Sequence, residues 1–261
     1  MTSESTPDYD DEIVDYLQLF RGEGFLSPGG ADETQRVLDH VDLNGRTVLE
    51  VGSGLGGCSL IMVAERGAAK VIGLDVEPVV IERARAATEA AGWSEHVEYR
   101  QVEPGPFPID DASVDAVFSK DAMCHIEDKQ ALYAEVFRVL KPGGQVAVGD
   151  WLSDRDPPYS EVMQTFIDST GLHFHLDSLD GVHKKLTAAG FENIEVVNRN
   201  QWFREEARRE AELLEGPLAD KVESLRGKSA TDSSNECQHH MIAALDSGEF
   251  CPAHFFASKP D

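Results

Sequence analysis

The sequence predicts an α/β fold with a mostly parallel sheet and helices on both faces. From residue 46 to residue 150, short apolar segments alternate with helical patterns of about ten to fifteen residues, and parallel strands need such crossovers. The apolar fraction of 41% is sufficient for a sizeable core. A length of 261 residues suits one domain with appendages, or two small domains. We favour one domain, because a strand pair from the last third would complete the same sheet.

The elements follow in order along the chain. Before the sheet we expect an acidic disordered start at residues 1–9, a helix at 13–20, a glycine-rich loop at 22–30 and a helix at 31–41. The alternating part is expected to hold strands at 46–51, 70–75, 96–101, 114–119 and 144–150, and helices at 57–66, 78–91 and 129–140. After a helical region at 151–190, we expect a strand at 194–198, helices at 202–226 and 234–246, and a last strand at 250–259.

The charge balance excludes one class of partner. With 48 Asp and Glu against 23 Lys and Arg, of which nine are Lys, the formal net charge is −25. Nucleic acid and anionic membranes would both be repelled, so we expect neither as a partner. A strongly acidic, lysine-poor surface on a folded protein is typical of high salt, where counterions screen self-repulsion. An acidic mesophilic protein is the alternative, and we favour the halophilic one.

The cysteines and the first residues predict a cytoplasmic protein. The four cysteines are far apart and form no CxxC pair, so we expect reduced thiols. The opening residues are polar and acidic, unlike a signal peptide, and no segment has eighteen consecutive apolar residues. The CQHH segment at 237–240 lacks an established metal-ligand spacing, so we favour a helix surface there and expect no metal site.

The most informative segment is VLEVGSGLGG, residues 48–57, where a strand passes through a glycine loop into a helix. Glycines at these positions allow a ligand to lie against the backbone. Gly52, Gly54 and Gly57 also satisfy the dinucleotide pattern GxGxxG, and Asp75 suits ribose in both classes of site. Glu50 suits the amino group of a methionine tail better than a pyrophosphate, and Glu103 could accept a hydrogen bond from an adenine amine.

These motifs together with RVLKPGG resemble the class I S-adenosylmethionine-dependent methyltransferases over residues 30–150. The resemblance implies a Rossmann-like fold, S-adenosyl-L-methionine as cofactor, and a domain at 30–261 with a cofactor half at 45–150 and an acceptor half at 151–261. Residues 1–29 would be an acidic segment and a helical cap over the site. The implied cofactor-binding residues are Glu50, Gly52, Ser53, Gly54, Gly56, Asp75, Val76, Val102, Glu103 and Lys120.

The acceptor site is expected in SKDAMCHIED, residues 119–128, after the fourth strand. Asp121 and His125 are four residues apart and would face the same way on one helical turn, although a capping Asp and a surface His remain the alternative. Together with Tyr16, GEGFLSPGG and GDW, this segment resembles the small-amine N-methyltransferases, which act on phosphoethanolamine or on sarcosine and dimethylglycine. The resemblance implies that Tyr16 and His125 form a catalytic pair and that Asp121 lies beside the amine.

The choice of acceptor depends on a missing cation. In the phosphobase enzymes, Tyr and Arg side chains after the fifth strand bind phosphate, whereas residues 166–178 here contain no Arg, Lys or Tyr. We therefore favour sarcosine and dimethylglycine, which lead to the osmolyte glycine betaine and match a salt-adapted protein. Phosphoethanolamine, another amine or a sulfur compound is the alternative, and a silent cofactor-binding protein is disfavoured by the intact site residues.

The expected substrate-binding residues are of two kinds. Aromatic faces could surround a quaternary ammonium, and the candidates are Phe25, Trp151, Phe174 and Trp202. An arginine could bind a substrate carboxylate; Arg204 is included among the expected residues, with Arg155 and Arg199 as alternatives between which the sequence does not choose. His173 and His175 could line the pocket or be ordinary loop residues. The sequence leaves the oligomeric state open.

Overall fold

The computed structural model describes residues 9–261 and contains a seven-stranded sheet with the strand order β3-β2-β1-β4-β5-β9-β8. In chain order the strands are β1 (Thr47–Val51), β2 (Lys70–Asp75), β3 (Val97–Gln101), β4 (Val114–Lys120), β5 (Leu140–Asp150), β8 (Glu192–Asn198) and β9 (Ala253–Ser258). Strands β1 to β5 pair in parallel, whereas β9 is antiparallel to both of its neighbours. The predicted mostly parallel seven-stranded sheet is confirmed.

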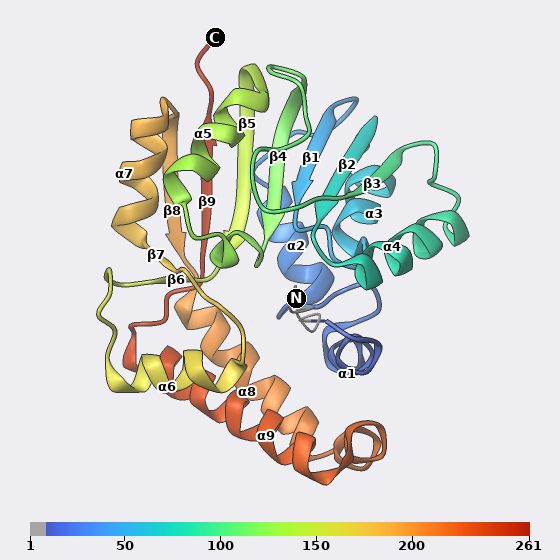
Figure 1. Cartoon of the computed structure of the whole chain (residues 1–261), viewed down its shortest axis with the longest axis vertical. Helices are drawn as coiled ribbons and strands as arrows, with labels where there is room; N and C mark the ends of the chain where they lie inside the picture. Colours follow the sequence, from blue (N-terminus) through green and yellow to red (C-terminus); the bar gives the residue numbers. More distant parts are fainter. Residues whose placement is uncertain (1–8) are drawn as a thin grey trace, which may run out of the picture.

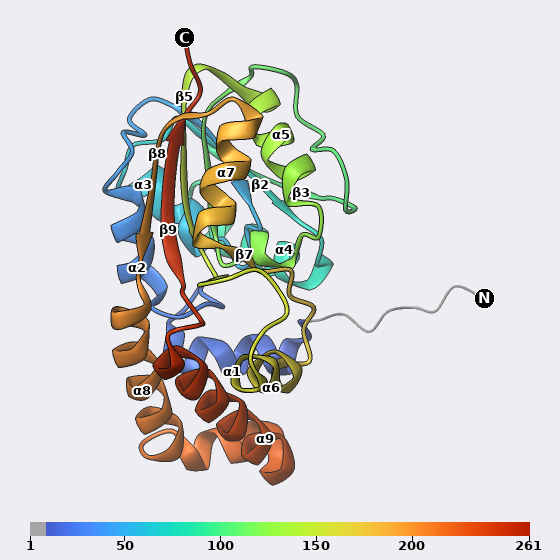
Figure 2. The same ribbon diagram turned by 90° about the vertical axis from the view of Figure 1, so that its left-hand side faces the viewer.

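Each central strand sends alternate side chains into two cores, because successive residues of a strand point to opposite faces. In β1, Val48 belongs to one core and Leu49 to the other. The first core is shared with α2 (Gly30–Leu38), α3 (Gly57–Ala64) and α4 (Pro78–Ala90), and the second with α5 (Lys129–Val139) and α7 (Leu179–Ala189). Figure 2 shows α2 and α3 on one face of the sheet and α5 and α7 on the other.

The region after β5 differs in detail from the prediction. Residues 151–190 contain α6 (Glu161–Thr170) and α7, but also the short strands β6 (Leu152–Ser153) and β7 (Asp177–Ser178), which form a separate two-stranded sheet. The predicted single helix at 202–226 is wrong. The chain forms α8 (Asn200–Glu215), turns at Gly216 and starts α9 (Ala219–Ser247).

Two further boundaries differ from the prediction. α9 bends at Gly227, whose φ of 76° lies in the left-handed region, so the helix expected at 234–246 is the second part of a longer one. β5 begins at Leu140 and includes the KPGG segment that we expected to precede the strand, with a shift in its register against β4. Such turn residues are poor strand formers, which is why the pattern predicted a later start.

The cap helix α1 (Asp11–Arg21) is capped at its amino end by Asp10. The side chain of Asp10 accepts a hydrogen bond from the amide of Ile13 at 2.9 Å. Figure 1 shows α1, α6, α8 and α9 beyond the end of the sheet at which the parallel strands terminate. Loops at the carboxyl ends of parallel strands form the binding edge of open α/β sheets. The division into a cap at 1–29 and a domain at 30–261 stays a prediction, and residues 1–8 lie outside the described residues.

Candidate active site

The glycine loop after β1 requires glycine at two positions. Gly52 has a φ of +75°, and a Cβ there would overlap the Cβ of Ala122. Gly56 has a φ of +83°, and a Cβ there would overlap the hydroxyl of Tyr99. Within residues 9–261, the buried hydroxyl of Ser53 makes no hydrogen bond. A main chain without side chains next to a hydroxyl that has no hydrogen-bond partner suits a polar ligand that contacts the backbone, as the predicted cofactor would.

Two carboxylates organise this loop. Asp75, at the end of β2, accepts hydrogen bonds from the amides of Gly54 at 2.8 Å and Glu77 at 3.1 Å. Glu50 is 1% exposed and accepts a hydrogen bond from the hydroxyl of Ser59 in α3. Burial raises the pKa of Glu50 to about 8, and repulsion from Asp75 adds to the rise. Both predicted cofactor carboxylates therefore lie at the glycine loop, one fixing its backbone and one contacting the next helix.

The loop that follows α1 lies directly on the glycine loop. The amide of Gly57 donates to the carbonyl of Gly24 at 3.2 Å. Lys120, the last residue of β4, donates through Nζ to the Ser27 hydroxyl at 2.6 Å and to the Pro28 carbonyl at 2.9 Å. Lys120 therefore holds this loop against the sheet edge, while the loop's role as a cap over the site stays a prediction.

The other predicted cofactor residues lie near the same edge with greater exposure. Val76 follows β2 and is 49% exposed. Val102 follows β3 and donates its amide to the carbonyl of Asp75 at 2.9 Å, and Glu103 beside it is exposed. Phe25 packs against Gly57 and the core beneath the cap loop, so the structure associates it with the glycine loop.

Two acidic residues lie at the carboxyl ends of neighbouring strands: Asp121 directly follows β4, and Asp150 is the last residue of β5. Asp121 has a left-handed backbone with φ of 52°, its amide donates to the carbonyl of Gly149 at 2.8 Å, and its carboxylate pairs with Lys120 at 2.9 Å. Asp150 is 4% exposed, and its Oδ1 has no hydrogen-bond partner within the described chain. Burial raises the pKa of Asp150 to about 7, opposed by Lys129 and increased by Asp121. An acidic edge of this kind favours a cationic or proton-donating ligand.

His125 lies in an aromatic group at the same edge. It stacks on Phe174 with ring centroids 4.8 Å apart, and Phe174 stacks on Trp151 at 5.2 Å. The Nδ1 atom of His125 lies 2.8 Å from the carbonyl oxygen of His173. Because a carbonyl only accepts, Nδ1 must carry the proton, which places the lone pair of the neutral ring on Nε2. The structure therefore brings together three predicted residues, in a tautomer suited to accepting a proton at Nε2.

The segment between Asp121 and His125 is not an α-helix, contrary to the expectation that both share one helical turn. Met123–His125 forms a 3₁₀ turn, η1, and Lys129 braces it by donating to the carbonyls of Met123 at 2.5 Å and Ile126 at 2.6 Å. The helix cap in this region is Asp128, which accepts from the amide at the start of α5. Asp121 is therefore not a helix-capping residue.

The two tyrosines of the cap lie in different places. Tyr16 is buried among α1, α8 and α9, with the guanidinium of Arg226 4.6 Å from its ring centroid, and burial raises its pKa. Tyr9, which the sequence analysis left in the acidic start, packs with Leu26 and Leu55 beside the glycine loop. The packing thus adds Tyr9 as a candidate that sequence reasoning missed. The signal available was a tyrosine next to the helix-capping Asp10.

The predicted carboxylate ligands are all paired with acids. Arg204 of α8 is 44% exposed and pairs with Asp246 at 2.8 Å. Arg155 pairs with Asp154 at 2.8 Å, also at an exposed position. Arg199 forms a two-pronged pair with Glu33 at 3.0 and 2.9 Å, and its guanidinium lies 5.2 Å from the Trp202 ring. Each of the three arginines therefore already has an acidic partner within the protein.

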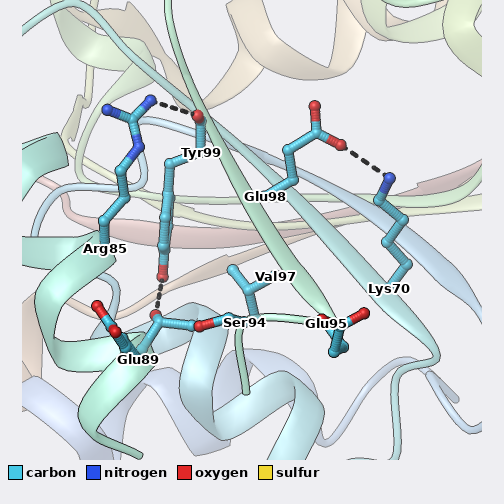
Figure 3. A pocket seen from close by; sticks show the side chains of 9 residues that line it. Lys70, Arg85, Glu89, Ser94, Glu95, Val97, Glu98 and Tyr99 are labelled. Carbon is cyan, nitrogen blue, oxygen red and sulfur yellow. Dashed lines mark hydrogen bonds and ion pairs between the residues drawn. The ribbon is translucent and has the colours of Figure 1, made fainter. Parts of the chain in front are cut away.

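A cavity of about 460 Å³ lies elsewhere, between α4 and the outer strands β2 and β3 (Figure 3). Lys70, at the amino end of β2, forms an ion pair with Glu98 of β3 at 2.8 Å. The hydroxyl groups of Tyr99 and Thr88 are hydrogen-bonded at 3.1 Å. Asp75 is at the opposite end of β2, so this cavity is not the cofactor site. In residues 9–261 no group of three potential ligands could hold a metal, and no helix is long and apolar enough to cross a membrane.

Comparison with known proteins identifies the domain. Residues 49–148 match the family described as methyltransferase domain. Phosphoethanolamine N-methyltransferase 1 of Arabidopsis thaliana is 32% identical over 236 residues, which are 90% of this chain and 45% of that protein. The chain spans less than half the length of the first curated relatives that it matches.

Two solved structures share the fold. Phosphoethanolamine N-methyltransferase 2 of Haemonchus contortus, in complex with phosphomonomethylethanolamine and S-adenosylhomocysteine, aligns with a TM-score of 0.89 at 24% identity, over 97% of this chain and 59% of that chain. A candidate sarcosine dimethylglycine methyltransferase from Galdieria sulphuraria aligns with a TM-score of 0.85 at 19% identity, over 97% of this chain and 98% of that chain. The predicted family and fold class are confirmed, and S-adenosylmethionine is the cofactor of this family.

Proposed function

Because this chain belongs to the class I S-adenosylmethionine-dependent methyltransferases, we propose that it methylates the nitrogen of a small zwitterionic amine, with sarcosine and dimethylglycine as acceptors. The observation that carries this proposal is the acidic and aromatic edge formed by Asp121, His125, Phe174 and Trp151. Its aromatic faces suit a nitrogen that gains positive charge, at about 0.5–2 kcal/mol per contact.

The proposed chemistry needs orientation and one proton transfer. The cofactor supplies an activated methyl group, so the protein must hold the acceptor nitrogen in line and deprotonated. An ammonium has no lone pair, and Nε2 of His125 is a suitable acceptor near neutral pH because Nδ1 donates to the carbonyl of His173. Asp121 would lie beside the amine, in keeping with its buried ion pair to Lys120.

Phosphoethanolamine is the second candidate, since the curated relatives are mainly phosphoethanolamine N-methyltransferases. Two features favour the zwitterion. Residues 166–178, between the middle of α6 and β7, contain no Arg, Lys or Tyr to bind a phosphate dianion. Asp168 in this segment would repel one.

The test is product analysis with labelled methyl donor across glycine, sarcosine, dimethylglycine and phosphoethanolamine. We expect methylated product from sarcosine and dimethylglycine. Preferential turnover of phosphoethanolamine would refute the proposed acceptor, and no methylation of any amine would refute the activity.

A salt-adapted setting and a role in betaine synthesis form part of the same proposal. The net charge of −25 implies strong self-repulsion that counterions would relieve. Stability and turnover should therefore rise as potassium chloride is increased from low to molar concentration. A steady loss of activity with salt would remove this part of the proposal and leave the acceptor chemistry to be judged on product analysis.

A further inference from the structure

A buried arginine at the end of the cap helix has no assigned role. Arg21 is the last residue of α1, and its side chain is 10% exposed. Its Nε lies 3.4 Å from Oε1 of Glu210, a fully buried residue of α8. Tyr16 and Cys237 are near enough for the guanidinium to lower their pKa values against the larger effect of burial. Arg21 thus lies where the cap meets α8 and α9.

One donor of the Arg21 guanidinium lacks a well-formed hydrogen bond within the described chain. A guanidinium has five N–H donors, and here Nη1 donates to the carbonyl of Leu26. Nε of Arg21 and Oε1 of Glu210 face each other at 3.4 Å, and within residues 9–261 neither atom has a well-aligned hydrogen bond. A well-formed pair between Arg and a carboxylate is two-pronged, with distances of about 2.7–2.9 Å. Buried donors left unpaired are costly, so this loose pair indicates a guanidinium able to accept a further anion.

The contrast with Arg199 sharpens this point. Arg199 also faces a buried carboxylate, that of Glu33, but with two hydrogen bonds at 3.0 and 2.9 Å. The chain therefore forms a closed two-pronged pair in one place and leaves Arg21 incompletely paired in another. The difference is in hydrogen bonding rather than in charge, since each arginine faces an acid.

The position of Arg21 connects it with the acceptor edge. Leu26, which accepts its hydrogen bond, is adjacent in sequence to Ser27, which accepts a hydrogen bond from Lys120 at 2.6 Å. Lys120 in turn pairs with Asp121 at 2.9 Å. The guanidinium thus contacts Leu26 directly, whereas the Asp121 carboxylate is connected to the neighbouring Ser27 only through Lys120. A small amino acid carries its cationic and anionic groups only a few bonds apart, so its binding site needs opposite charges on neighbouring parts of the protein.

We propose that Arg21 binds the carboxylate of the acceptor amine while Asp121 lies beside its nitrogen. This inference rests on the proposed function and specifies which group recognises the acid end of the substrate. Glu210 compensates the charge of the buried guanidinium, and the acceptor carboxylate supplies the well-formed hydrogen bond that Nε lacks. Arg21 would then select amines that carry a carboxylate over those that lack one.

The test compares dimethylglycine with dimethylethanolamine, which has a hydroxyl group where dimethylglycine has a carboxylate. The main variant is the double substitution Arg21→Gln/Glu210→Gln, because removing only the arginine would leave Glu210 buried and uncompensated. Arg208→Gln is the matched control. Arg208 lies in α8, as Glu210 does, but it is exposed and pairs with Asp246. Binding of both amines to the complex with S-adenosylhomocysteine is measured by calorimetry, together with KM and kcat.

We expect the double variant to weaken dimethylglycine binding and raise its KM by about 10- to 100-fold, the range of a charge-assisted hydrogen bond. Affinity for dimethylethanolamine and for S-adenosylhomocysteine should change less than twofold, as should every value for Arg208→Gln. Glu210→Gln alone should leave dimethylglycine binding equal or tighter, and Arg21→Lys should give an intermediate KM because it keeps the charge but not the fork. If the double variant does not fold, Glu210→Gln and Arg21→Lys still test the proposal, because each has its own expected effect on dimethylglycine.

Equal weakening for both amines would overturn the inference, as would unchanged affinity for dimethylglycine. Loss of S-adenosylhomocysteine affinity alone would assign Arg21 to the cofactor and overturn it as well. These outcomes are distinguishable from failure of the proposed function, which is judged on the unsubstituted protein. If that protein neither binds nor methylates dimethylglycine, the acceptor is wrong before any variant is made.

Discussion

The glycine loop and the acceptor edge of this molecule are built from the chain in different ways. The glycine loop is one continuous segment, residues 52–57, and its shape comes from backbone angles and from the absence of Cβ atoms. The proposed acceptor edge is assembled from side chains of distant segments, such as Asp121, Trp151 and Phe174. A backbone site therefore depends on local sequence, whereas a side-chain site depends on how separate elements pack.

The largest effect is expected where the backbone site has no room for a side chain. Gly52→Ala would combine an unfavourable φ with overlap of the Ala122 Cβ, so S-adenosylhomocysteine affinity should fall more than 100-fold and activity should be undetectable. Gly92→Ala is the control, because Gly92 has a similar φ of +79° but open space around it. It should cost only about 1–2 kcal/mol of stability. Calorimetry and thermal unfolding provide both measurements.

A second substitution separates the two causes in the Gly52 variant. Ala122→Gly removes the Cβ that would overlap, so adding it to Gly52→Ala should restore part of the cofactor affinity. If the double variant binds no better than Gly52→Ala, the overlap is not the cause, and the claim of a backbone-determined site loses its steric basis.

The next effect concerns the acceptor edge. His125→Ala should lower kcat by about 10²- to 10³-fold, because Nε2 of His125 is the proposed proton acceptor. The Kd for S-adenosylhomocysteine should stay within about threefold, because His125 belongs to the aromatic group with Phe174 rather than to the glycine loop. Rapid-quench kinetics and calorimetry measure the two values. Unchanged kcat would remove His125 from the mechanism, and an equal loss of cofactor affinity would show that the glycine loop and the acceptor edge are not separate sites.

A smaller effect distinguishes the two tyrosines of the cap. Tyr9 packs beside Leu55 of the glycine loop, whereas Tyr16 packs against α8 and α9. We expect Tyr9→Phe to lower kcat about tenfold, and Tyr16→Phe to change stability more than kcat. Activity assays with thermal unfolding test this. The reverse order of effects would return the catalytic role to Tyr16, as the resemblance of the sequence implied.

These comparisons explain what the sequence could and could not predict. The sheet, the glycine loop and the position of Glu50 and Asp75 follow from local patterns, and the structure agrees with them. The break at Gly216 was predictable, because Gly216 and Pro217 form a dipeptide typical of turns, although charged helical patterns lie on both sides of it. Arg21 and its loose partner Glu210 are 189 positions apart, so no spacing in the sequence connects them. Pairing that depends on tertiary packing cannot be predicted from periodicity.

The smallest effect is on stability, and it tests how the backbone site is held. The pKa of Glu50 is raised to about 8, whereas an unfolded Glu has a value of about 4.3. Between about pH 4.3 and pH 8, Glu50 is protonated in the folded protein and ionised in the unfolded chain. The free energy of unfolding should therefore fall as the pH rises through this range. Glu50→Gln cannot ionise and would keep the hydrogen bond from Ser59. It should raise Tm by roughly 10 °C at pH 9 and by only a few degrees at pH 5.

Glu98→Gln provides the opposite sign in the same measurement. The hydrogen bonds from Arg100 and Lys70 lower the pKa of Glu98 to about 2, so its ionised form stabilises the fold above pH 4 and this stability is lost as the pH falls. The Glu98 variant should therefore have a lower Tm at neutral pH, by a small amount because the pair is exposed. If Glu50→Gln shows the same pH dependence as the unsubstituted protein, Glu50 is ionised in the fold. The negative charge of Glu50 would then be tolerated beside the glycine loop, and backbone shape alone would not account for how the loop is held.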